Sequence, residues 1–181
     1  SLGSNPAKEM VPLSDTVEAV LQALNSGVFV VAAAGNSAVG ENNSDVSTPA
    51  SIEGVIAVGA HSRDGNAWKN SAIGDDLDPI SGENRRFPNQ KPEVSAPGVL
   101  LWSSISTVNQ APYAYSTGTS DSTMIVTGAL ALILQKHRDI ISGVDSEIDK
   151  EEMNKVKIAL AISSSDTIDS NPIHDSKLGY G

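Results

Sequence analysis

Ser120 stands at the start of a strongly apolar segment, in a position where a serine hydroxyl could act as a nucleophile. Gly118-Thr119-Ser120 precede residues 121–134, DSTMIVTGALALIL, whose apolar side chains cover nearly every direction around a helix. This pattern predicts a buried helix. The first N–H groups of a helix lack helical acceptors and carry partial positive charge, so they would stabilise a negative charge developing beside Ser120. Ser and Thr are also common helix caps, and the segment alone favours that interpretation.

Asn36 is the second candidate, because it follows an apolar run at residues 28–34, VFVVAAA. The run lies between Gly27 and Gly35 and predicts a fully buried parallel strand. Ligands bind open α/β sheets at the carboxyl ends of the strands. The small residues before Asn36 leave room for a ligand side chain, and its amide offers an uncharged donor. Taken alone, an asparagine in this position is more typical of a turn.

The segments that would position these residues alternate between strands and helices. Apolar periodicity, glycines and capping residues predict helices at 14–26 and 149–162, strands at 28–34 and 55–60, and a pair of strands at 99–105 and 113–117 that leads into the buried helix. Asp15 with Glu18, and Asp149 with Glu152, have the spacing of a capping box. The alternation predicts an α/β fold with a mostly parallel sheet, helices on both faces, and a buried central helix that begins at the nucleophile.

Composition limits the classes of partner. The 181 residues suffice for one domain with a core, and 12 basic against 22 acidic residues give a net charge of −10. This balance argues against nucleic acid or an anionic membrane as a partner. The chain has no cysteine, no run of about 18 apolar residues and no visible signal peptide.

Six segments, in order along the whole chain, resemble the subtilisin-like serine proteases, or subtilases. They are Ser1-Leu2-Gly3, Ala33-Ala34-Gly35-Asn36, residues 55–60 (VIAVGA), residues 91–99 (KPEVSAPGV), Gly118-Thr119-Ser120 with residues 128–132 (GALAL), and residues 178–181 (LGYG). Each motif alone is weak. Their common order makes the resemblance specific.

The resemblance implies a serine endopeptidase with a partial subtilisin-like fold. Ser120 would attack the peptide carbonyl, and the Asn36 side chain and the Ser120 N–H would hold the oxyanion. Substrate binding would fall to the strand Ser1, Leu2 and Gly3, to the pocket residues Ala33, Ala34 and Gly35, and to Thr119. The polypeptide substrate would pair with the Ser1–Gly3 strand.

The same resemblance implies that the catalytic acid and base precede this chain. Subtilases order their triad Asp, His, Ser, and His61, His137 and His174 all lie outside the family's histidine motif. Residues 1–181 are therefore expected to be the C-terminal portion of one catalytic domain, inactive alone, with the missing N-terminal portion as partner. Exposed sheet edges would favour self-association of the fragment.

Some departures and alternatives stay open. Asp121-Ser122 replaces the family's usual Met-Ala, and the Asp121 carboxylate would oppose an oxyanion. It favours the alternative of a non-catalytic module that binds extended peptide. A nucleotide-binding loop after residue 35 lacks the Lys-Ser/Thr that phosphate needs. No cofactor is evident, no metal ligand set can be assigned, and calcium and an extracellular or cell-surface location follow from resemblance only.

Overall fold

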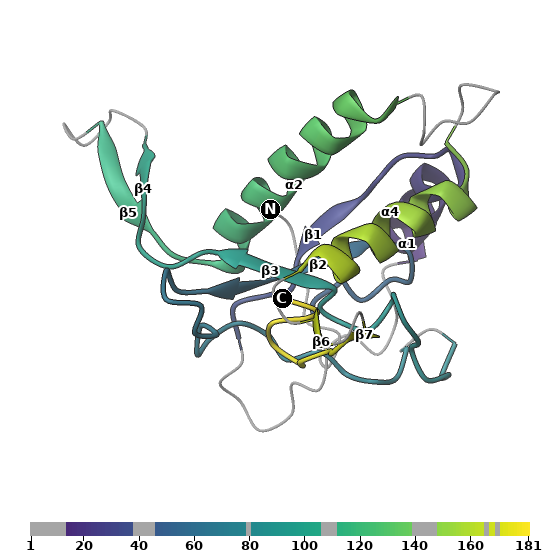
Figure 1. Cartoon of the computed structure of the whole chain (residues 1–181), viewed down its shortest axis with the longest axis horizontal. Helices are drawn as coiled ribbons and strands as arrows, with labels where there is room; N and C mark the ends of the chain where they lie inside the picture. The colour runs from purple at the N-terminus through teal and green to yellow at the C-terminus, as the bar shows by residue number, and fades with distance from the viewer. Residues whose placement is uncertain are drawn as a thin grey trace.

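The fold is described from a computed structural model, which covers residues 14–37, 46–78, 81–105, 112–138, 148–164, 167–168 and 171–181 (Figure 1). The predicted substrate strand Ser1-Leu2-Gly3 lies outside the described residues.

A three-stranded parallel sheet forms the centre, in the order β1 (Val31–Ala33), β2 (Ile56–His61) and β3 (Val94–Pro97). The predicted strands at 28–34 and 55–60 are confirmed as β1 and β2, although the ladder of β1 is shorter than its apolar run. The chain stays extended beyond it, because Val30 O accepts from the Ile56 N–H at 2.9 Å. β3 was not among the predicted strands, since Ser95 and two prolines interrupt its apolar pattern.

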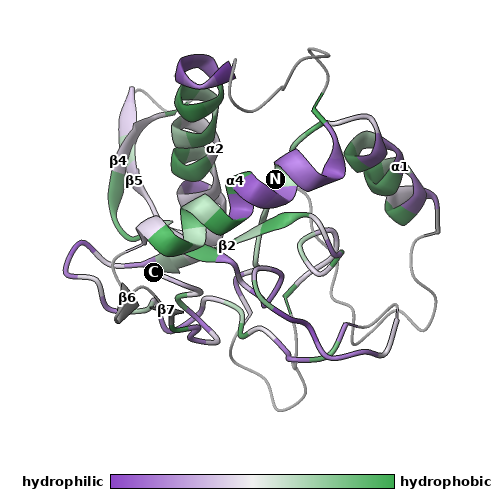
Figure 2. Cartoon of the chain, turned by 45° about the vertical axis from the view of Figure 1, so that its right-hand side comes forward, coloured by the Kyte–Doolittle hydropathy of each residue, from purple (hydrophilic) through white to green (hydrophobic). Residues whose placement is uncertain are grey.

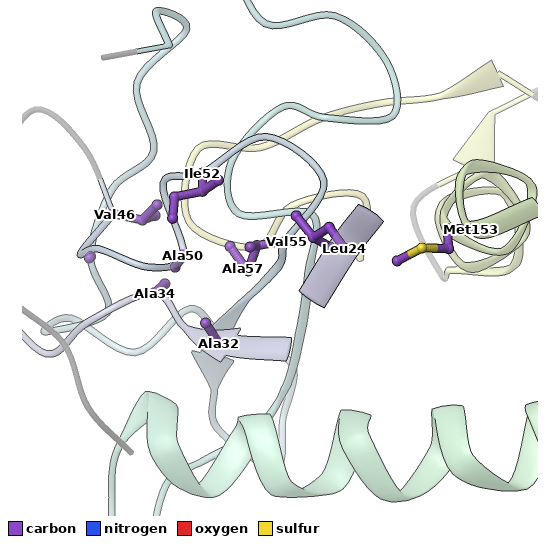
Figure 3. Packing of buried hydrophobic residues seen from close by; sticks show 10 residues of the cluster. Leu24, Ala32, Ala34, Val46, Ala50, Ile52, Val55, Ala57 and Met153 are labelled. Atoms are coloured by element: carbon purple, nitrogen blue, oxygen red, sulfur yellow. The ribbon is translucent and has the colours of Figure 1, made fainter. Parts of the chain in front are cut away.

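Alternate residues of the strands face two hydrophobic clusters, one on each side of the sheet. On one side Ala57 packs with Leu24 of α1 (Ser14–Asn25), as Figure 3 shows. On the other side Val58 packs with Leu130 of α2 (Thr119–Lys136). Helix α4 (Lys150–Ser163) contributes Met153 to the first cluster and Val156 to the second. The predicted α/β arrangement with helices on both faces is confirmed.

Burial of α2 is one-sided, whereas its sequence predicted burial all round. The residues that face the sheet are buried, namely Thr119, Ser122, Thr123, Val126 and Leu130. Met124 and Leu132 are 75% and 66% exposed, and apolar residues run along the helix in Figure 2. Only one face of α2 meets the strands, so an apolar sequence all round leaves its outward face uncovered by the described residues.

Two short hairpins complete the described structure. β4 (Leu101–Ser104) pairs antiparallel with β5 (Tyr113–Ser116), which confirms the predicted pair of strands, and the hairpin extends from the body of the molecule next to the start of α2 (Figure 1). β6 (Thr167–Ile168) and β7 (Asn171–Pro172) form a smaller one near the C-terminus.

The two predicted capping boxes have different outcomes. Asp149 is the N-cap of α4, its side chain accepts from the Glu152 N–H at 2.9 Å, and the Glu152 carboxylate accepts from the Asp149 N–H at 3.0 Å. Asp15 instead lies inside the first turn of α1, because that helix already begins at Ser14. A residue inside the helix cannot be its N-cap, so the box at Asp15 and Glu18 was wrong.

A buried ion cluster supports β2 and β3 near their amino ends. Glu93 Oε1 accepts from Lys91 Nζ and from Lys157 Nζ of α4, both at 2.8 Å, and Glu93 Oε2 accepts from the Ala57 N–H at 2.7 Å. Burial opposes the ionised Glu93 carboxyl, but the two ammonium groups hold its pKa below the usual value. Burial is also the main reason that the pKa of Lys91 falls to about 8.

Candidate active site

The start of α2 is held by two strands that are not neighbours in the sheet. Just after β3, Gly98 O accepts from the Gly118 N–H at 2.8 Å, and within β3, Ala96 O accepts from Ser122 Oγ at 2.8 Å. After β1, Asn36 Oδ1 accepts from Thr119. A Cβ on Gly98 would lie only 2.1 Å from Ser122 Oγ, so this close approach of helix and strand requires glycine. These bonds place the first turn of α2 at the carboxyl end of the sheet, where ligand sites of α/β folds form.

Ser120 is the second residue of α2 and is half-buried. Gly118 is the N-cap and has no side chain with which to cap the helix. The interpretation of Ser120 as an ordinary N-cap is therefore wrong. Its hydroxyl and N–H belong to the first turn, where backbone N–H groups point out of the helix and carry partial positive charge.

The orientation of the Asn36 amide follows from its two donors. Asn36 Oδ1 accepts from the Thr119 N–H at 2.9 Å and from Thr119 Oγ1 at 2.8 Å. A backbone N–H only donates, so the atom that faces it must be the amide oxygen. The amide nitrogen is then directed away from Thr119, and it lies 3.4 Å from the point that a Gly118 Cβ would occupy. Asn36 is exposed and adjoins the residue before Ser120.

The three small residues before Asn36 differ in what they can offer a ligand. Ala33 is half-buried at the end of β1, whereas Ala34 is 0% exposed and packs in the hydrophobic cluster on the α1 side. Only the backbone of Ala34 is left to face a pocket. Gly35 has φ +120°, and a Cβ there would lie 2.5 Å from Ser47 Oγ. Its N–H donates to Thr119 Oγ1 at 3.2 Å, which joins the predicted pocket segment to the helix start.

Asp121 has a defined partner on the hairpin. Ser116 Oγ of β5 donates to Asp121 Oδ2 at 2.9 Å, and the Asp121 side chain is half-buried. The same carboxylate oxygen lies 3.6 Å from the point that a Gly118 Cβ would occupy. The Asp121 carboxylate and the Asn36 amide nitrogen therefore both adjoin Gly118, on the side where its Cβ would stand.

The three histidines are engaged elsewhere. His137 is the C-cap of α2, about 25 Å along the helix axis from Ser120. The His174 ring contacts Pro92 O at 2.9 Å, before β3 and hence at the opposite end of the sheet. The His61 ring contacts Ser62 O at 2.7 Å, and strand alternation places it on the face opposite α2. That the catalytic base lies in a preceding portion of the domain stays a prediction.

The described residues show neither a grouped set of metal ligands nor a membrane-spanning helix. Among the described residues, no three His, Asp or Glu side chains are grouped to hold a metal ion, so nothing in that part of the chain identifies a calcium site. None of the described helices is long and apolar enough to cross a membrane.

Sequence reasoning missed the role of Ser122, which is fully buried and bonds to β3. A polar residue at a core position of an apolar helix was the available signal.

Comparison with known proteins finds relatives that match most or all of this chain. The sequence profile of the Subtilase family matches residues 1–181. Subtilisin DY of Bacillus licheniformis is 38% identical over 120 residues, which cover 66% of this chain and 37% of that protein. The serine protease AprX of Bacillus subtilis (strain 168) is 35% identical over 156 residues, or 78% of this chain and 34% of that protein. This chain thus spans about a third of the length of these relatives.

A solved structure shows the same fold. The prenylagaramide maturation protease PagA matches 99% of this chain and 55% of its own chain, with a TM-score of 0.64 and 24% sequence identity.

Proposed function

Because the chain belongs to the subtilase family, we propose that it is the C-terminal portion of a serine endopeptidase domain, with Ser120 as the nucleophile. Ser120 Oγ attacks the carbonyl of the peptide bond, and a histidine from the N-terminal portion takes its proton. The acyl-enzyme that forms is then hydrolysed by water. The substrate is a polypeptide, bound beside the carboxyl end of β1 and, upstream, by Ser1, Leu2 and Gly3.

The observation that carries this proposal is the bonding of Asn36 to Thr119. It commits the amide oxygen to the start of α2, and in the proposed site the Nδ2 group donates to the substrate carbonyl oxygen beside Ser120. The Ser120 N–H, in the first turn of α2, supplies the second donor. Two such donors form the oxyanion hole, which stabilises charge in the transition state more than in the ground state.

Fluorophosphonate labelling of the native full-length protein tests the nucleophile. We expect one label, on Ser120, that is lost in Ser120→Ala. Failure of the folded protein to label would refute the protease proposal and favour the peptide-binding module, which the acidic residue beside Ser120 first suggested.

Substitution of Asn36 tests the oxyanion hole. Asn36→Asp keeps the oxygen that binds Thr119 and replaces the donor with an acceptor, so the helix start remains anchored. We expect kcat to fall by about 10²- to 10³-fold or more, the typical loss for one oxyanion-hole donor. An Asn36→Asp variant with undiminished kcat would exclude this role.

The N-terminal portion is the partner of the exposed elements. Among the described residues β1 pairs only with β2, and the outward face of α2 is apolar and exposed. Additional strands beside β1 and a cover over α2 would bury both. Alone, the 181-residue chain is expected to self-associate through these surfaces. It is also expected to be inactive, because it lacks the histidine that would take the proton of Ser120. Ser120-dependent cleavage by the purified fragment would contradict this. Family membership also supports an extracellular or cell-surface location.

A further inference from the structure

The Asp121 carboxylate lies on the same side of the helix start as the proposed oxyanion hole. The point that a Gly118 Cβ would occupy is 3.4 Å from Asn36 Nδ2 and 3.6 Å from Asp121 Oδ2. One of these atoms is the donor proposed for the oxyanion hole, and the other belongs to a carboxylate. A negative charge on a bound oxyanion would therefore form close to a second negative charge.

Asp121 is also prevented from turning freely. Ser116 Oγ donates to Asp121 Oδ2 at 2.9 Å, and Ser116 ends the β4–β5 hairpin. The hydroxyl therefore holds the same carboxylate oxygen that lies beside Gly118, and it opposes rotation of the carboxylate away from that position. None of the charged residues of this chain lies in residues 112–120, so no cation in that stretch offsets the charge.

We propose that Asp121 is an electrostatic brake on the reaction of Ser120, and that Ser116 sustains the brake by holding the carboxylate in place beside the proposed oxyanion hole. This inference rests on the proposed function and adds a regulator to that site. Asp121 takes no part in bond making. Its charge raises the energy of the anionic transition state and leaves the neutral bound peptide almost unaffected, so it lowers kcat and spares KM.

Three variants of the native full-length protein separate charge from structure. Asp121→Asn removes the charge and keeps an oxygen for Ser116, and we expect kcat to rise about tenfold with KM within twofold, as expected for one charge acting at close range in a partly buried site. Asp121→Glu keeps the charge and should stay near the wild-type kcat. Ser116→Ala removes the tether and lets the charged carboxylate turn away, so it should raise kcat, by less than Asp121→Asn does.

Binding of a peptide boronic acid gives a readout that a purely structural role would not move. Its tetrahedral adduct with Ser120 is anionic, so Asp121→Asn should bind it about tenfold more tightly than wild type, while a peptide with a neutral C-terminal amide binds equally to both. An unchanged or lower kcat in Asp121→Asn, or equal boronate affinity, would overturn the brake. If no variant forms a Ser120 adduct, the proposed function itself fails. A loss of folding in Asp121→Asn that Ser116→Ala shares would show that the contact is structural and would also overturn the brake.

Discussion

Glu93 neutralises two buried ammonium groups at once, so Glu93→Gln should be among the most destabilising single substitutions in the chain. Lys91 and Lys157 both donate to Glu93 Oε1 at 2.8 Å, and their side chains are 0% and 4% exposed. A glutamine removes the charge, and its NH2 group must face either the ammonium groups or the Ala57 N–H, all of which are donors. Breaking a buried ion pair in this way costs about 3–5 kcal/mol. With an m-value of about 2 kcal/mol per molar urea, the unfolding midpoint should fall by about 2 M.

The assay is urea unfolding of the native full-length protein in a Ser120→Ala background, which prevents self-digestion. Glu151→Gln is the matched control, because the Glu151–Lys155 pair has nearly the same N–O distance, 2.9 Å, with side chains 77% and 65% exposed. An exposed pair contributes little, so this control should leave the midpoint unchanged. If Glu93→Gln shifts the midpoint no more than Glu151→Gln does, the ion cluster does not stabilise the fold as reasoned here.

Three further predictions concern acid stability, a helix cap and the helix start. The pKa of the Glu93 carboxyl is lower in the folded than in the unfolded state. The stability that ionised Glu93 gives the fold is therefore complete above the unfolded pKa of about 4.5 and is lost as the pH falls through the folded pKa. Acid titration followed by circular dichroism should show a steeper loss of stability in wild type than in Glu93→Gln. Asp149→Ala removes the N-cap of α4 and should cost about 1 kcal/mol in denaturant unfolding, whereas Asp149→Asn should retain most of it. Gly98→Ala puts a methyl group against Ser122 Oγ and should displace the start of α2, with a loss of fluorophosphonate labelling that Ser122→Ala partly rescues.

Local signals in the sequence predicted the elements whose determinants are themselves local. The Asp149 capping box and the apolar runs of β1 and β2 were recognisable because each depends on a few adjacent residues. β3 was missed since its place in the sheet depends on pairing with β2, and its serine and prolines weaken the strand pattern. The box at Asp15 failed because the spacing also occurs one residue inside a helix that begins at Ser14.

Family motifs pointed to Ser120 and Asn36, and the structure places Asn36 against Thr119, the residue before Ser120. What the motifs could not give is the set of contacts between distant segments. The contact of Ser116 with Asp121, the bond from Ser122 to β3 and the shared carboxylate of Glu93 all depend on tertiary packing. The error over the exposed face of α2 has the same cause. An apolar sequence predicts that a helix is buried, but it does not identify the elements that pack against each of its faces.

The anchoring of α2 by both β1 and β3 has a consequence for when the serine becomes reactive. Thr119 and Asn36 are separated by 83 positions, and Ser122 and Ala96 by 26. Contacts that close long loops form late in folding, since their entropic cost precedes their gain. In the function proposed above, the nucleophile and its oxyanion hole are therefore completed only when the sheet has already assembled. A newly made chain would then acquire proteolytic activity as one of its last folding events, after the segments that a protease could cleave have folded.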